Sequence, residues 1–271
     1  MRAGAACLLL ALPLTAVAAE GPRPIRAKAA PPALDLTQAA TRGDVEAVRS
    51  ALDRGAAIDA VDSHGLRGTA LEKAAAKGHR DVVELLLARG ATIRVVQGTG
   101  LNAAHWAAVG GHTEILRMLV ERAAPEDPDA ALASALVAAA YMGHTDIVTY
   151  LLDVGVHVDA IPPRPQMPTA LEASAERGHL ELADFLLDRG AQVRVIDGRG
   201  VAAAEGVAAY GDVALLRRIA NAVEGREEPR ILYGPALAQS SRAGHAPAVA
   251  LLLVSGLAAC VFASRCKRAD A

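Results

Sequence analysis

A short turn signal recurs seven times along this chain, and its regular spacing constrains the fold more than any other feature. A glycine followed by histidine or aspartate occurs every 32 to 35 residues, at Gly43-Asp44, Gly78-His79, Gly111-His112, Gly143-His144, Gly178-His179, Gly211-Asp212 and Gly244-His245. A related, mostly alanine-rich segment precedes each turn, and an apolar segment follows it. Self-similarity at this period is the sequence signature of a solenoid.

The unit at residues 102–120, NAAHWAAVGGHTEILRMLV, shows how one repeat is expected to fold. Its alanines lie on one face of a first short helix, and Gly110-Gly111 ends that pattern. A second helix then carries an apolar face formed by Ile115, Leu116, Leu119 and Val120. Isolated helices shorter than about 12–15 residues are marginal in water. Each pair must therefore bury its apolar faces on neighbouring pairs.

The unit resembles the ankyrin repeat, which has a T-P-L-H-x-A-A start, a G-H turn, and a V-V-x-L-L-L second helix followed by x-G-A. Residues 69–91, TALEKAAAKGHRDVVELLLARGA, are the closest copy. The resemblance covers residues 34–256, although the proline of the T-P pair is absent from every unit, with Ala70 and Ala103 among its replacements. It implies an all-α ankyrin-repeat solenoid of about seven helix-turn-helix units with β-turn or hairpin fingers between them.

The connections between units differ from one another. Residues 62–65, 97–100 and 197–200 fit the family's finger turn, with a polar residue at the start and glycine at the end. Residues 124–133, 159–168 and 224–235 depart from that pattern, and we expect them to form irregular fingers. Irregular loops on a rigid scaffold are where binding specificity tends to lie.

The first residues of the chain predict the cellular location of the protein. Residues 1–19 combine Arg2, a short apolar core and the small residues Val17-Ala18-Ala19, a pattern typical of a secretory signal peptide. Residues 20–33 hold four prolines and are expected to form an extended linker before the repeat domain at 34–256. We therefore expect an exported protein, periplasmic or secreted, with a C-terminal tail at 257–271.

The C-terminal apolar stretch leaves an alternative open. Residues 246–263 contain no charged side chain, and 18 apolar residues reach the lower limit for a transmembrane helix. Their phase, following Gly244-His245, favours a final capping repeat. The alternative is a periplasmic scaffold anchored in the inner membrane by this segment. Cys260 and Cys266, the cysteines left after signal cleavage, have a spacing that allows a disulfide without establishing one.

Several chemistries are disfavoured by the sequence. A formal net charge of −2 argues against a generic nucleic-acid binder. The segments 98–103 and 198–203 match G-x-G-x-x-A, but they lie 100 residues apart at one repeat phase, and the short repeat has no room for a nucleotide-binding βαβ unit. We expect no cofactor.

The repeated histidines do not indicate a metal site. Stacked helices lie about 8–10 Å apart, whereas zinc ligands lie about 2 Å from the ion. The resemblance implies a structural role for them, with hydrogen bonds near the turn. Glu72, Glu172 and Glu205 fall on separate units, so we expect them to cap or solvate the first helices. With no catalytic motif, the chain is not expected to be an enzyme.

The resemblance implies a non-catalytic protein-interaction module, which we expect to be a monomer that binds a protein or peptide in its concave groove and fingers. Trp106 is expected to pack between units, with a role as an interface anchor as the alternative. Repeat phase predicts these contact residues: Ser63, His64, Leu66, Lys77, Thr99, Leu101, Tyr141, Met142, Gln166, Met167, Arg177, Arg199 and Tyr210.

Overall fold

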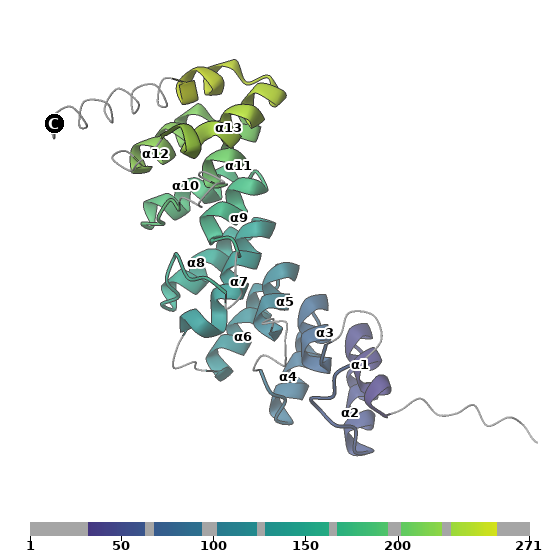
Figure 1. The fold of residues 1–271 in the computed structure, drawn as a ribbon. Helices are drawn as coiled ribbons and strands as arrows, with labels where there is room; N and C mark the ends of the chain where they lie inside the picture. Colours follow the sequence, from purple (N-terminus) through teal and green to yellow (C-terminus); the bar gives the residue numbers. More distant parts are fainter. Residues whose placement is uncertain are drawn as a thin grey trace, which may run out of the picture. The chain divides into compact units, whose positions relative to one another are not determined.

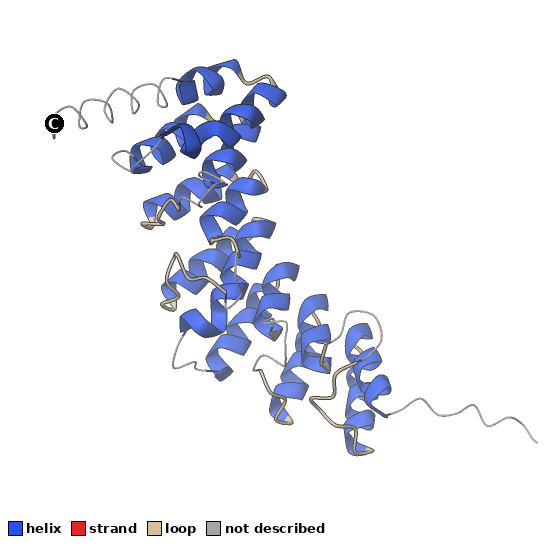
Figure 2. Ribbon diagram, viewed as in Figure 1, coloured by secondary structure: helices blue, strands red, loops and turns tan. Residues whose placement is uncertain are grey.

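The described part of the chain consists of helices joined by short turns (Figure 2). The structure is a computed structural model, and it describes residues 32–62, 68–93, 102–123, 128–162, 167–194, 202–223 and 229–253. No strand occurs in these ranges. The predicted all-α class is confirmed.

Within the described ranges, the helices form seven successive pairs, which we call units 1 to 7 (Figure 1). In chain order the pairs are α1 (Pro32–Arg42) with α2 (Val45–Asp53), α3 (Ala70–Lys77) with α4 (Arg80–Ala88), α5 (Ala103–Gly110) with α6 (Thr113–Ala123), α7 (Pro128–Met142) with α8 (Thr145–Asp153), α9 (Ala170–Glu176) with α10 (Leu180–Asp188), α11 (Ala202–Tyr210) with α12 (Val213–Val223), and α13 (Pro229–Ala243) with a helical segment at 246–253. The predicted turn glycines lie between the two helices of each pair.

Neighbouring units stack through their first helices. α1 contacts α3, α3 contacts α5, and the series continues to α11 and α13. Small side chains make this stacking close, since Ala74, Ala107 and Ala139 are completely buried. The backbones also approach closely at Gly206 on α11, where an added Cβ would lie 2.6 Å from the carbonyl carbon of Ala175. These short helices therefore depend on their neighbours for burial, as the sequence predicts.

Two of the first helices, α3 and α9, begin at reciprocal side-chain caps. Thr69 and Glu72 form a reciprocal capping box on α3, and Thr169 and Glu172 form the same box on α9. Each box satisfies two backbone N–H groups that the first turn of a helix leaves without partners. The predicted capping role of both glutamates is confirmed, and Glu205 on α11 is exposed to solvent.

Two of the three connections predicted as irregular fingers are partly helical instead. α7 begins at Pro128, inside the predicted finger at 124–133, and α13 begins at Pro229, inside the one at 224–235. Proline is favoured at the first position of a helix, where its missing N–H costs nothing. Both helices are 15 residues long, so they extend beyond the first helices of the other units.

Contacts between units 1 and 2 recur between units 4 and 5, at residue numbers that are higher by one hundred. Arg89 pairs with Asp53 at 3.1 Å, and Arg189 pairs with Asp153 at 3.5 Å. Likewise the Thr92 N–H donates to Asp59 at 2.9 Å, and the Gln192 N–H donates to Asp159 at 3.0 Å. The chain thus repeats a three-unit pattern as well as a single-unit one.

The termini lie mostly outside the described residues, including the predicted signal peptide at 1–19 and tail at 257–271. α1 begins at Pro32, so the last two residues of the predicted linker are helical. In the C-terminal apolar stretch, residues 246–253 are helical and 254–263 are not described. Among the helices of the described ranges, none is both long enough and apolar enough to cross a membrane.

Candidate partner-binding surface at the helix turns

The candidate surface is formed by the C-terminal ends of the first helices, where each chain reversal presents two residues ahead of its glycine. At Gly143 the backbone has a φ of +77°. Residues with a Cβ adopt this left-handed conformation only at a cost in free energy. The His144 N–H then donates to the Ala139 carbonyl at 2.9 Å, which closes the end of α7. This reversal brings Tyr141 and Met142 to a defined place on unit 4.

A ladder of aromatic side chains holds successive turns together. The Nε2 of His79 lies 3.0 Å from the Thr41 carbonyl oxygen of the preceding unit, and that of His179 lies 3.2 Å from the Tyr141 carbonyl oxygen. Each ring also lies over the turn glycine of the preceding unit, so that a Cβ added at Gly143 would be 2.6 Å from His179 Cε1. The structural role implied for these histidines is confirmed.

Unit 6 lacks the ladder histidine, and Tyr210 takes its place. Asp212 stands at the histidine position and caps α12 instead, with its carboxylate accepting from the Leu215 N–H at 2.9 Å. The ring of Tyr210 lies over Gly178, and its hydroxyl makes a long hydrogen bond of 3.5 Å to the Glu176 carbonyl. Tyr210 was predicted only as a contact residue. Aspartate at the ladder position was the sequence signal for its structural role.

Exposed apolar side chains nevertheless mark this surface on units 4 and 6. Tyr141 is 38% exposed, Met142 41% and Tyr210 48%. The guanidinium carbon of Arg177 on unit 5 lies 4.6 Å from the centre of the Tyr141 ring, a distance at which a cation and a ring attract each other. The structure therefore places Tyr141, Met142, Arg177 and Tyr210 on three consecutive units.

The structure describes two of the other predicted contact residues. Lys77 is exposed at the same position of unit 2, and Met167 is half-buried ahead of α9. The remaining predictions lie outside the described residues: Ser63, His64, Leu66, Thr99, Leu101, Gln166 and Arg199. Trp106 is half-buried on α5 and meets the His105 ring edge-on, with ring centres 5.4 Å apart.

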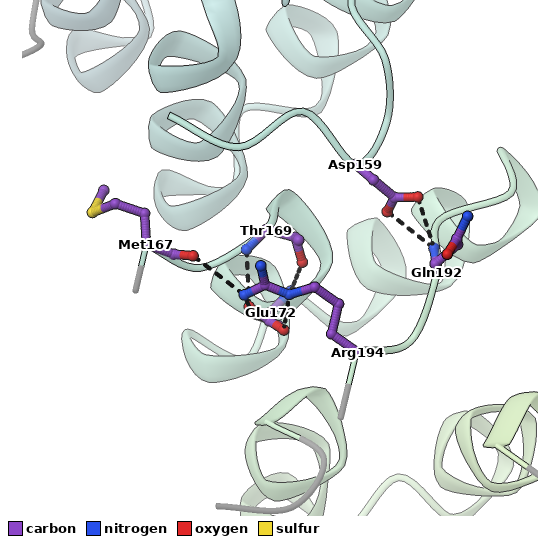
Figure 3. Close-up of polar contacts among 6 residues, drawn as sticks. All are labelled: Asp159, Met167, Thr169, Glu172, Gln192 and Arg194. Carbon is purple, nitrogen blue, oxygen red and sulfur yellow. Dashed lines mark hydrogen bonds and ion pairs between the residues drawn. The ribbon is translucent and has the colours of Figure 1, made fainter. Parts of the chain in front are cut away.

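A buried ion pair at the other end of α9 was not anticipated from the sequence (Figure 3). Arg194 donates to both carboxylate oxygens of Glu172, at 3.0 and 2.8 Å, and to the Met167 carbonyl at 3.2 Å. The Glu172 side chain is only 5% exposed, and it also accepts from the Thr169 N–H at 2.9 Å. This arrangement fixes the segment that precedes α9, which contains Met167, and the segment that follows α10, which contains Arg194. The signal was a carboxylate at a buried cap position with arginine 22 residues later.

The equivalent glutamate on unit 2 lies in a similar setting. Burial raises the pKa of Glu72 above its ordinary value, while the Thr69 N–H acts in the opposite direction. No cluster of three or more potential metal-ligating side chains occurs in the part of the chain that the structure describes. The described turn surface presents aromatic, thioether and cationic side chains to solvent.

Comparison with known proteins agrees with this architecture. A family model described as "Ankyrin repeats (3 copies)" matches residues 36–131, 92–162 and 125–197, which together span more than half of the chain. The sequence matches no curated protein. A crystal structure of the human ASB11 ankyrin repeat domain is similar, with a TM-score of 0.62 and 22% identity, covering 81% of this chain and 96% of that one. At that identity the likeness concerns the fold alone. The stacked units, the turn ladder and the family match together show that this chain belongs to the ankyrin-repeat family.

Proposed function

We propose that this chain is a non-catalytic protein-interaction module that binds a protein or peptide partner across its helix turns. The observation that carries the proposal is the exposure of Tyr141 and Met142 on unit 4 and of Tyr210 on unit 6, within a row of turns that the ladder of aromatic rings joins. Amphipathic aromatics and methionine suit contact with a partner. Because the turns are held rigidly, binding requires little ordering of the scaffold, which preserves affinity.

Site-specific photo-crosslinking in cells tests this proposal. One probe replaces Met142, and a matched control probe replaces Val154, which is 37% exposed in the same unit. Val154 follows α8 at the opposite end of the helix pair, about 13 Å from the turn at 1.5 Å per residue. We expect a discrete adduct from position 142 alone. Equal adducts from both positions, or none from either, would contradict a binding surface at the turns.

We also propose that the protein is exported and acts as a monomer beyond the cytoplasm. Support for export comes from the signal-like pattern of residues 1–19. Intact mass measurement of the mature protein should give a chain that begins at Glu20, and the variant Ala19→Arg should keep its full length. A mature protein that retains residues 1–19 would contradict export by cleavage. Size-exclusion chromatography with light scattering tests the monomer.

A further inference from the structure

The row of residues ahead of the turn glycines changes its chemistry along the stack of units. Units 1 and 2 present the cations Arg42 and Lys77, both exposed. Unit 4 presents Tyr141 and Met142, and unit 6 presents Tyr210. One part of the surface is therefore cationic, and another part is aromatic and apolar.

The two cations of units 1 and 2 are available to a partner. No ion pair within the described residues engages either Arg42 or Lys77. The nearest carboxylate in sequence to Arg42 is Asp44, and its Oδ1 is occupied by the Ala47 N–H at 2.9 Å, where it caps α2. Arg177 of unit 5 differs from them, because it stacks on the Tyr141 ring and follows the exposed Glu176.

We propose that the partner is an extended peptide segment with acidic residues over units 1 and 2 and aromatic or branched aliphatic residues over units 4 to 6. This inference rests on the proposed function and names the chemistry of its partner. Complementary charge orients a partner and excludes partners of the wrong sign. The apolar side chains near Met142 supply the anchoring contacts, as buried aromatic and aliphatic groups do in other interfaces.

The stacking of the units also gives the spacing within that segment. Neighbouring first helices contact one another, and packed helices lie about 8–10 Å apart. Two steps separate Lys77 on unit 2 from Met142 on unit 4, which corresponds to about 16–20 Å. An extended chain covers that span in about five or six residues at roughly 3.3 Å each. A carboxylate should therefore precede or follow the apolar anchor at about that separation.

Selection from a random 16-residue peptide library displayed on phage, with the purified mature chain as bait, tests this proposal. We expect enriched peptides to carry aspartate or glutamate about five or six residues from an aromatic or branched aliphatic residue. The double variant Arg42→Glu/Lys77→Glu should weaken binding of these peptides by about tenfold, because it replaces two exposed attractive charge pairs by repulsive ones. Arg242→Glu is the matched control, because Arg242 is an exposed cation of unit 7, beyond the proposed acidic end.

The possible outcomes separate this inference from the function on which it rests. Enriched peptides that depend on Met142 but carry no acidic residue would overturn the charge assignment alone. Equal weakening by Arg242→Glu and by the double variant would overturn it as well, since it would indicate a general charge effect. Failure to enrich any peptide whose binding is lost in Met142→Ala would contradict the binding surface itself. Circular dichroism of each variant ensures that only folded proteins are compared.

Discussion

At the residue scale, the turn glycines carry two constraints at once. Gly143 adopts a positive φ, and its open Cα face receives the His179 ring of the next unit. Gly155, after α8, has a positive φ of +98° but no atom within 4 Å of an added Cβ. The first glycine therefore serves the contact between units, whereas the second serves only the local backbone.

These two glycines separate the backbone cost from the packing cost. Alanine at either position adopts the left-handed conformation at about 1–2 kcal/mol. Gly143→Ala also forces a methyl group onto His179, and overpacking costs about 1–3 kcal/mol. We expect chemical denaturation to show a loss for Gly143→Ala that exceeds the loss for Gly155→Ala by at least about 1 kcal/mol. Equal losses would mean that the ladder ring moves aside freely.

A hydroxyl between units 3 and 4 controls the ionisation of Asp146. The Thr113 hydroxyl donates to the Asp146 carboxylate at 2.8 Å, and this bond is the main reason that the pKa of Asp146 lies below its ordinary value. A lowered folded-state pKa stabilises the fold above the unfolded pKa, and this stability is lost as the pH falls through the folded pKa.

The variant Thr113→Val tests that linkage. We expect the pKa of Asp146, followed by NMR titration of the carboxylate, to rise toward the ordinary value of an aspartate. The difference in the free energy of unfolding between wild type and variant should shrink as the pH falls through the folded-state pKa of Asp146. The reason is that the protonated carboxyl no longer gains from the hydroxyl donor. Thr145→Val, one residue from Asp146, serves as the control. An unchanged pKa in Thr113→Val would contradict this assignment.

At the scale of elements, the ends of α9 are held by different means. Its beginning carries the capping box and the buried pair of Glu172 with Arg194. At its C-terminal end, the Glu176 carbonyl accepts a hydrogen bond from the Tyr210 hydroxyl of the next unit. A seven-residue helix has too few internal hydrogen bonds to persist alone. These contacts and the stacking on α7 and α11 hold it in place.

Loss of Arg194 should be much more costly than loss of an exposed arginine. Arg194→Ala leaves the buried Glu172 carboxylate without its cation. Removing one partner of a fully buried pair costs about 3 kcal/mol or more. We expect a smaller loss here, because Arg194 is partly exposed. Arg89→Ala removes an exposed pair with Asp53, which contributes about 0–1 kcal/mol. We expect denaturation midpoints to follow this order. The reverse order would show that water replaces Arg194 without cost.

At the scale of the whole described repeat array, stability is passed from neighbour to neighbour. In the described array, the strongest contacts of each first helix are with the adjacent first helices and with the second helix of its own unit. In such arrays the total stability is approximately the sum of the unit stabilities and the nearest-neighbour interface terms. Damage at one interface should therefore remain local.

The variant Gly206→Ala tests this locality. Its added methyl would meet the Ala175 backbone at 2.6 Å, between units 5 and 6. We expect hydrogen exchange to accelerate in α9, α11 and α13 and to remain nearly unchanged in α1 and α3, because the latter share no contact with the altered interface. Gly234→Ala, where an added Cβ meets nothing within 4 Å, is the control. Uniform acceleration along the chain would indicate a single cooperative unit instead.

The sequence by itself determined the class of fold, the number of helix pairs and the position of each turn. These follow from local periodicity and from turn glycines whose positive φ other residues adopt only at a cost. It also located the exposed ends of the first helices at Tyr141 and Met142. Only the tertiary structure decided that Tyr210 substitutes for a ladder histidine, that Arg194 neutralises Glu172, and that α7 begins at Pro128. The two contacts join residues 34 and 22 positions apart. Which side chains meet across such separations depends on how the units stack, and a local sequence pattern does not encode that stacking.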